Sequence, residues 1–270
     1  MTSYDASTDP QLTLLGAVLA HLLEHARRHD VDVLLVGAAA RDVLIRHATG
    51  ALPQRATADV DIAVAVADWA AYTRLTAELS PAGRSSHTFR VADIEVDIVP
   101  FGGIESADRT ISWPDGYVMN TLGFREALGC AITVTLPGAA TVKVASLPAQ
   151  AVLKLHAWRD RRLITTRDAI DLRTILQTYS DGPYLDRLYD ASEHILAAYD
   201  FDPQLAGAHR LGVELRNTLG AAIAEDCRQI IAAEADRDDR LAAEMGGSIE
   251  HNRLLLNATS AGAASDGNET

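Results

Sequence analysis

The sequence has few of the residues that mark secreted or membrane proteins. Two of its 270 residues are cysteines, and Cys130 and Cys227 form no spaced metal-binding motif. Two isolated cysteines are typical of a reducing cytosol rather than of a disulfide scaffold. No apolar run approaches the roughly 20 residues of a membrane span, and the first residues lack a secretion signal. We therefore expect a cytoplasmic protein with no membrane partner.

Positive charge is also scarce, because 24 Lys and Arg face 37 Asp and Glu, which leaves a net charge of -13. This balance excludes a protein that coats nucleic acid through broad, non-specific contacts, although a local basic groove remains compatible with it. Apolar residues make up 48% and charged residues 23%, as in an ordinary globular protein with a sizeable core.

The hydrophobic pattern changes once along the chain, at Ser146-Leu147-Pro148. Residues 11–146 alternate between helical and strand periodicity, which predicts an α/β (α+β) domain with a mixed sheet. Residues 147–257 show helical spacing only and predict an all-helical domain. We expect the small, polar residues 258–270 to form a disordered tail and residues 1–10 to be mobile.

Two acids with alternating spacing lie in one predicted strand, Ala58-Asp59-Val60-Asp61-Ile62-Ala63-Val64. Residues two apart on a strand share a face, so Asp59 and Asp61 should project together. Two neighbouring carboxylates repel each other unless a cation lies between them, and Mg²⁺ takes such oxygen ligands. Taken alone, the pattern is more typical of a half-exposed strand with two solvated acids.

A third acid, Asp97, follows in the apolar strand Ile94-Glu95-Val96-Asp97-Ile98-Val99-Pro100-Phe101. If it is buried, it needs a partner or a metal ion. If the two strands are neighbours, three carboxylates converge. The alternative is that Asp97 pairs with an arginine or lies on an exposed edge.

The earlier strand Val31–Val36 ends at Gly37, and a predicted helix begins directly after it. A strand–glycine–helix corner presents free backbone N–H groups and the positive end of a helix dipole, where a phosphate can bind. Gly37 permits close approach of a ligand to the backbone. Many strand–helix turns contain a glycine, so the corner is informative only in combination with the acids.

The start of the helical half is basic. Residues 148–174 contain six Lys or Arg and three Asp, a local charge of +3. This favours an anionic ligand at Lys154 and the nearby arginines, or else a solvated face with helical ion pairs. Asp168 could orient Lys154 or cap a helix.

Together these features predict nucleotidyl transfer. Two metal ions, typically about 3.5–4 Å apart, stabilise the attacking oxygen and the leaving phosphate. Asp59 and Asp61 would hold the metals, and Asp97 would bridge one metal and act as base near the attacking hydroxyl. Lys154 would hold the triphosphate and neutralise developing charge.

The chain resembles the polymerase-β-type nucleotidyltransferase superfamily and, within it, the AbiEii-like abortive-infection toxins. The resemblance covers about residues 30–175 and rests on four segments: Val36–Asp42, Asp59–Asp61, Val96–Phe101 and Leu153–Leu172. It implies a catalytic domain over residues 11–146, two Mg²⁺ ions and an NTP substrate. It also implies an RNA acceptor, often a tRNA end, or a protein acceptor, together with an antitoxin.

The turn departs from the superfamily pattern, because Gly37 is followed by Ala38 rather than by serine or glycine. The segments around Arg41-Asp42 and Arg55 are similar to those of tRNA CCA-adding enzymes, which implies nucleotide contacts at Arg41, Asp42 and Arg55. Gly37 and Ala38 are expected to bind the nucleotide through the turn itself. Two alternatives remain open. One is a nucleotide-binding or partner-binding module without turnover, and the other is a nucleotidyltransferase acting on a small molecule such as an antibiotic.

Overall fold

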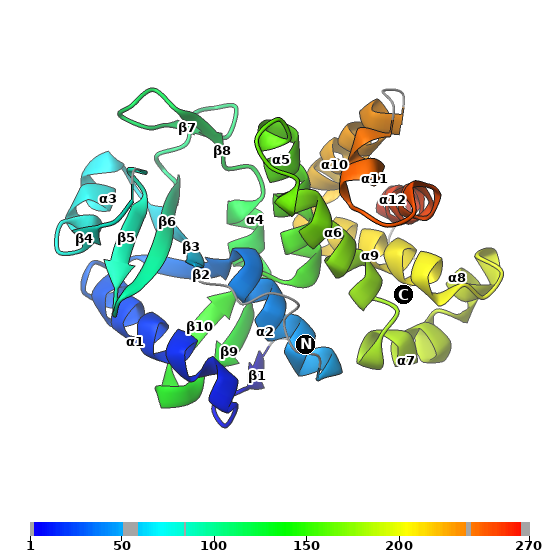
Figure 1. The fold of residues 1–270 in the computed structure, drawn as a ribbon, viewed down its shortest axis with the longest axis horizontal. Helices are drawn as coiled ribbons and strands as arrows, with labels where there is room; N and C mark the ends of the chain where they lie inside the picture. The colour runs from blue at the N-terminus through cyan, green and yellow to red at the C-terminus, as the bar shows by residue number, and fades with distance from the viewer. Residues whose placement is uncertain (1–2, 51–58, 84, 236–238, 266–270) are drawn as a thin grey trace. The chain divides into compact units, whose positions relative to one another are not determined.

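The computed structural model describes residues 3–50, 59–83, 85–235 and 239–265 (Figure 1). The chain divides into two compact units. The first holds the described residues of Met1–His47 and Leu52–Ser146, and the second holds those of Ala48–Ala51 and Leu147–Thr270. The second unit thus takes over at Leu147, where the hydrophobic pattern of the sequence changes.

A mixed sheet forms the first unit and confirms the predicted fold class. Its eight described strands lie in the order β1-β9-β10-β2-β3-β6-β5-β4. Their bounds are Ser3–Asp5 (β1), Asp32–Val36 (β2), Asp59–Val66 (β3), Ser80–Pro81 (β4), Thr88–Val91 (β5), Ile94–Gly102 (β6), Ile132–Thr135 (β9) and Thr141–Val144 (β10). The central strands β2, β3 and β6 are rich in Val, Ile and Leu, as expected for strands that are covered by other elements.

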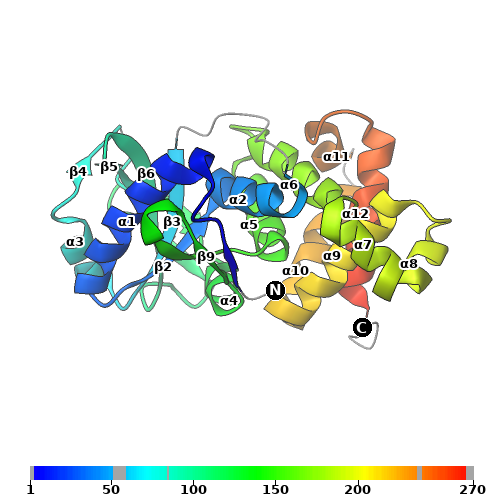
Figure 2. The ribbon, with the colours of Figure 1, turned by 90° about the horizontal axis from the view of Figure 1, so that it is seen from below.

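The first unit also contains helices α1 (Thr13–Arg28), α2 (Gly37–Thr49) and α3 (Trp69–Thr76). Helix α1 packs against β2, β10 and β5 and can be followed across the sheet in Figure 2. Its buried residues include Val18, Leu19 and Leu22, whose spacing places them on one helical face. Helix α3 packs against β3, and its Tyr72 hydroxyl donates a hydrogen bond to the Ile98 carbonyl of β6 at 2.9 Å.

Three short elements lie between β6 and β9. Strand β7 (Thr110–Ser112) forms a two-stranded sheet with β8 (Val118–Asn120). Helix α4 (Phe124–Gly129) follows them. Elements this short provide too few residues for a periodic pattern to be recognised.

The N-terminal segment is more ordered than expected. Strand β1 pairs in parallel with β9, so the sheet begins well before residue 11. The Tyr4 hydroxyl donates to the carbonyl of Val43 at 3.0 Å, and Asp9 forms an ion pair with Arg46. The prediction that residues 1–10 are mobile is therefore wrong for residues 3–10, because pairing with a distant strand supplies the order.

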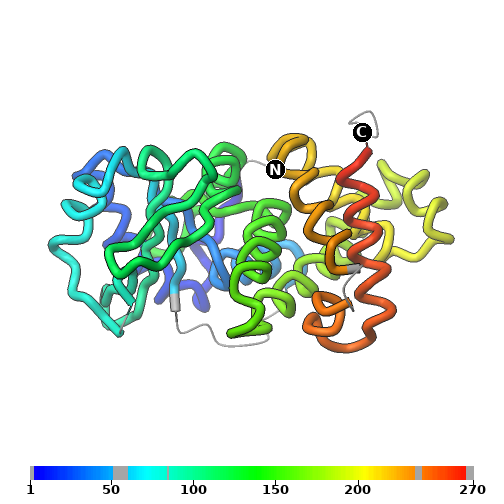
Figure 3. Tube along the Cα trace, turned by 90° about the horizontal axis from the view of Figure 1, so that it is seen from above, coloured from blue at the N-terminus to red at the C-terminus, as the bar shows by residue number. Residues whose placement is uncertain are grey.

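The second unit is helical throughout its described residues from 147 onward, as predicted. Its helices are α5 (Leu147–Arg161), α6 (Arg167–Thr178), α7 (Gly182–Ala191), α8 (Glu193–Ala198), α9 (Pro203–Leu219), α10 (Ala221–Ala235), α11 (Arg240–Glu244) and α12 (Ile249–Ala264). Figure 3 shows the trace of α12, in red, beside that of α10, in orange, and the two helices are in contact. Among the described residues, no helix has the length and apolar character needed to cross a membrane.

Helix α12 contradicts the predicted disordered tail as far as Ala264. Residues Ala258, Thr259, Gly262 and Ala263 are buried against the rest of the unit. A Cβ atom at Gly262 would lie 2.0 Å from the carbonyl oxygen of His209 in α9. The small residues that suggested disorder therefore let two helices approach closely.

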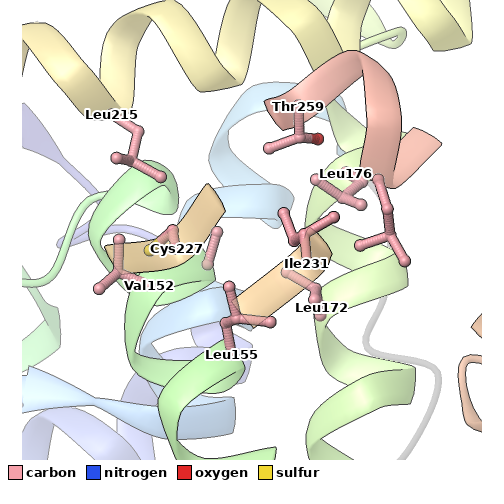
Figure 4. A pocket seen from close by; sticks show the side chains of 10 residues that line it. Val152, Leu155, Leu172, Leu176, Leu215, Cys227, Ile231 and Thr259 are labelled. Atoms are coloured by element: carbon pink, nitrogen blue, oxygen red, sulfur yellow. The ribbon is translucent and has the colours of Figure 1, made fainter. Parts of the chain in front are cut away.

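A small apolar cavity of about 20 Å³ lies in the core of the helical unit (Figure 4). Its lining comes from α5, α6, α9, α10 and α12 and comprises Ala151, Val152, Leu155, Leu172, Leu176, Leu215, Cys227, Ile231, Leu256 and Thr259. Burial raises the pKa of the Cys227 thiol to about 12, so the thiolate is scarce at neutral pH. This cavity is a packing gap and Cys227 is a core residue.

Candidate active site

The register of two strands determines where the acids lie. Strands β3 and β6 are parallel neighbours in the middle of the sheet (Figure 1), and Asp61 is the Cα partner of Asp97. Asp59 is in turn the partner of Glu95. Partners in adjacent strands share a face, so the backbone brings together the positions that the sequence singled out. The side chain of Asp59 lies outside the described part of the chain.

The turn after β2 meets the second of these acids. Val36, the last residue of β2, is the Cα partner of Asp61, so Gly37 follows directly at this point of the sheet. Gly37 has a φ of +66°, and a Cβ built on it would lie 2.0 Å from Oδ2 of Asp61. The carboxylate therefore occupies the space that any other residue would need, which explains why glycine stands here.

Asp97 is held from its other side. Strand β5 is antiparallel to β6, and Thr88 is the Cα partner of Asp97. The Thr88 hydroxyl donates a hydrogen bond to Oδ1 of Asp97 at 2.5 Å. Burial raises the pKa of Tyr72, and the negative charge of Asp97 raises it further, so this phenol stays protonated. Asp97 is half-buried and lies inside the sheet, not on its edge.

The predicted nucleotide contacts on helix α2 have other partners within the unit. Arg41 is 5% exposed, and its guanidinium donates to Oδ1 of Asp42 from Nε at 2.8 Å and from Nη2 at 2.6 Å. Ala38 is half-buried in the first turn of the helix. Arg55 lies outside the described residues.

In the helical unit, Lys154 is bound by two carboxylates of α6. Its Nζ lies 3.2 Å from Oδ1 of Asp168 and 2.8 Å from Oδ2 of Asp171. Asp168 is fully buried and also accepts two hydrogen bonds from Arg161, at 2.6 and 2.8 Å. Asp168 thus forms an ion pair with Lys154, the contact that a role in orienting Lys154 would need.

The ionisation of Asp168 follows from these contacts. Burial alone would raise the pKa of this carboxyl group. The hydrogen bonds from Arg161 and the charges of Lys154 and Arg161 outweigh burial and hold the pKa below its usual value. Asp168 is therefore ionised at neutral pH. The positive charges of Lys154 and Arg161 balance the negative charges of Asp168 and Asp171.

Two other arginines of the basic stretch are paired as well. Arg162 forms an ion pair with Glu234, and Arg159 lies 3.3 Å from Asp160 and 3.7 Å from Asp226. Of the two explanations for the local positive charge, the structure favours an ion-paired face at these positions. The sequence count missed this because Glu234 and Asp226 lie far along the chain.

Three partners of site residues were not singled out by the sequence, namely Thr88, Arg161 and Asp171. Asp171 could have been found, because it lies three residues after Asp168 and therefore on the same face of one helix. Thr88 could not, since an isolated threonine in a strand gives no pattern until the strand register is known.

The donor set at β3 and β6 suits a hard divalent cation. Carboxylate oxygens are the ligands of Mg²⁺, and the Gly37 turn leaves no side chain between the backbone and the Asp61 carboxylate. Among the side chains that the structure describes, no three His, Cys, Asp or Glu gather closely enough to hold a metal. Asp59, the third expected ligand, is not among those side chains.

A comparison with protein families is consistent with a nucleotidyltransferase site. The family described as “Nucleotidyl transferase AbiEii toxin, Type IV TA system” matches residues 21–243. The chain therefore belongs to the AbiEii family and is a nucleotidyltransferase.

Comparison with solved structures found an antibiotic-resistance factor and a CCA-adding enzyme at low similarity. The antibiotic-resistance factor ANT(2'')-Ia in solution has 10% identity and a TM-score of 0.36 over 70% of this chain and 95% of that one. Its crystal structure with adenylyl-2"-tobramycin has 14% identity and a TM-score of 0.38 over 70% and 98%. The Thermotoga maritima CCA-adding enzyme with tRNA has 13% identity and a TM-score of 0.24 over 97% and 81%. A search of curated proteins found no match.

Proposed function

We propose that this nucleotidyltransferase moves a nucleoside monophosphate from an NTP to a hydroxyl group of RNA, with the 3' end of tRNA as the first acceptor to test. The observation that supports the chemistry is the pairing of Asp61 with Asp97 beside the Gly37 turn. The RNA acceptor rests on the family resemblance, and a protein or a small hydroxylated molecule is an alternative outcome of the same assay.

Asp59, Asp61 and Asp97 would hold two Mg²⁺ ions. When bound, the ions neutralise charge on the phosphates during in-line displacement. Asp97 accepts the proton of the acceptor hydroxyl. The hydroxyl oxygen forms a bond to the α-phosphorus, the bond from that phosphorus to the bridging oxygen breaks, and pyrophosphate leaves with the electron pair.

Gly37 and Ala38 supply backbone N–H groups at the start of α2, where the helix dipole favours a phosphate. Alanine offers no hydroxyl at the second position, so this contact is made by backbone alone. Arg41 and Arg55 are proposed to contact the nucleotide. Because Arg41 already binds Asp42, we expect it to act with its carboxylate partner as a fixed unit.

Lys154 is proposed as the cation for the triphosphate. Two of its three N–H donors face Asp168 and Asp171, which fixes the direction of the third. Asp168 is then a positioning residue that acts through Lys154. Its own link to Arg161 holds the carboxylate in place.

The test incubates the purified chain with Mg²⁺, each α-labelled NTP and total tRNA, beside an Asp61→Asn variant. We expect label on RNA with the wild type and at least about a 1,000-fold slower transfer with the variant, because an activating ligand is lost. Asp32→Asn is the matched control, since Asp32 is an exposed acid of β2 that pairs with Lys143.

The remaining outcomes separate the alternatives. Label on protein or on a lysate metabolite instead of RNA would replace the acceptor but keep the chemistry. NTP binding by calorimetry without product in any fraction would favour a binding module without turnover.

A toxin role and an antitoxin partner are proposed from the family. We expect expression of the wild type in a bacterial host to arrest growth, Asp61→Asn to relieve the arrest, and co-expression of the neighbouring reading frame to protect the cells. Growth arrest by Asp61→Asn equal to that of the wild type would contradict an enzymatic toxin.

A further inference from the structure

Strand β5 pairs with β6 and places a different residue opposite each of the two acids, Glu95 and Asp97. Strands β5 and β6 are labelled in Figure 1; Thr88 is the Cα partner of Asp97, and Arg90 is the partner of Glu95. On the other side of β6, the same two acids face Asp61 and Asp59 of β3. By backbone register alone, Glu95 would be as good a candidate metal ligand as Asp97.

The partner of Glu95 carries the opposite charge. The Arg90 guanidinium lies 3.3 Å from Oε1 of Glu95, and both side chains are about half exposed, at 49% and 45%. A cation at this distance competes with Mg²⁺ for the carboxylate. Glu95 therefore forms a half-exposed ion pair with Arg90.

The partner of Asp97 leaves its charge intact. Thr88 contributes a neutral hydroxyl, which binds Oδ1 at 2.5 Å. Within the described part of the chain, Oδ2 of Asp97 has no hydrogen-bond partner. One oxygen is fixed and the other is available to a cation or to a hydroxyl proton.

The hydroxyl also restricts the orientation of the carboxylate. The terminal torsion of an aspartate is broad, so an unrestrained carboxylate samples many directions. Threonine is branched at Cβ and stiff in a strand, and its hydroxyl therefore provides a fixed point. Ligands that are oriented by such partners bind metals more tightly than free ones.

We propose that Thr88 is a positioning residue that locks the Asp97 carboxylate with Oδ2 free for the metal ion, while Arg90 withholds Glu95 from the site. This inference rests on the proposed function, because it assigns Asp97 as the ligand. It identifies β5 as the strand that decides which acid of β6 serves the site.

The experiment measures Mn²⁺ binding to the full chain by electron paramagnetic resonance, with and without a non-hydrolysable ATP analogue. We expect Thr88→Val to weaken Mn²⁺ binding by about 10-fold or more, the size of effect seen when a ligand loses its orienting partner. Thr88→Ser keeps the donor and should stay within about 3-fold of the wild type. If Thr88 had a purely structural role, Thr88→Ser would not restore Mn²⁺ binding while Thr88→Val weakens it.

Three further variants complete the set. Thr88→Ala replaces Thr88→Val if the latter fails to fold, as judged by thermal melting without metal. Glu95→Gln should leave Mn²⁺ affinity unchanged, and Thr133→Val in β9 controls for a Thr-to-Val change in the same sheet.

The outcomes distinguish this inference from the proposed function. If Asp97→Asn abolishes Mn²⁺ binding but folded Thr88→Val and Thr88→Ala bind as the wild type does, Thr88 has no positioning role. If Glu95→Gln weakens binding as much as Asp97→Asn, the selection by β5 is wrong. If Asp97→Asn itself binds normally, the metal assignment under the proposed function fails first.

Discussion

At the scale of single residues, the Asp61 carboxylate leaves no room for a side chain at position 37. Gly37→Ala would place a Cβ 2.0 Å from the Asp61 carboxylate and force alanine into a φ of +66°. We expect a loss of about 2–4 kcal/mol in the free energy of unfolding, from strain and overpacking together. Displacement of the carboxylate should lower transfer activity by at least about 100-fold. Urea unfolding and the labelled-NTP assay measure the two effects.

Gly83→Ala is the matched control for that variant. Gly83 has nearly the same backbone conformation, with a φ of +65°, but a Cβ there meets nothing within 4 Å. It should cost only about 1 kcal/mol and leave activity unchanged. Equal activity of Gly37→Ala and Gly83→Ala would show that the close approach to Asp61 has no part in the reaction.

His156 makes a prediction about pH. Burial lowers its pKa to about 4, although the charge of Asp226 partly opposes this, so the folded chain holds the imidazole neutral. Between pH 6.5 and pH 4 the unfolded chain binds the proton first, and stability therefore falls as the pH falls. From pH 7 to pH 5 this residue should remove about 2 kcal/mol from the free energy of unfolding.

The measurement is urea unfolding of the wild type and His156→Leu at both pH values. The variant should show a smaller loss between pH 7 and pH 5, whatever its stability at pH 7. Identical pH dependence of the two proteins would place the titration at another group.

At the scale of elements, the α9–α12 contact depends on glycines in both helices. A Cβ at Gly212 would lie 2.1 Å from the Thr259 carbonyl oxygen, and one at Gly262 would lie 2.0 Å from that of His209. Gly262→Ala improves helix propensity but should destabilise the protein by about 2–3 kcal/mol, because the two helices must separate. Thermal melting measures this effect.

Gly129→Ala is the control for that change, since Gly129 ends helix α4 with open space at its Cβ position. It should be neutral or slightly stabilising. If Gly262→Ala were equally harmless, the end of α12 would not be held in the packing described above, and the original expectation of a disordered tail would be restored.

At the scale of the whole molecule, charge limits how RNA can bind. The net charge is -13, and Lys154, Arg159, Arg161 and Arg162 are each engaged with carboxylates. We expect binding to a homopolymer RNA weaker than about 10⁻⁴ M at physiological salt. For tRNA, log K against log salt should have a slope shallower than about -3, because few phosphates are neutralised. Fluorescence anisotropy across a salt series measures both, and a slope steeper than about -5 would reveal a basic surface beyond these pairs.

The sequence by itself determined the central strands, the longer helices and the chemistry of the candidate residues. Alternation in 59–64 and 94–101 predicted strands with acids on one face, and apolar spacing predicted the helices from Leu147 onward. These features depend only on neighbours in the chain, which is why they could be predicted. The metal-binding role of Asp59, Asp61 and Asp97 and the phosphate roles of Lys154 and Arg55 stay predictions, and the Asp61→Asn and Asp97→Asn variants test the metal-binding role.

The tertiary structure alone decided which elements meet. Strand register brought Asp97 between Asp61 and Thr88, and helix packing gave Arg162 its partner Glu234. Pairing with β9 ordered the first strand, and packing against α9 ordered the end of α12, where local composition suggested mobility. The physical reason is that pairing and close packing are long-range terms: their free energy belongs to two segments at once, and neither segment shows it when read alone.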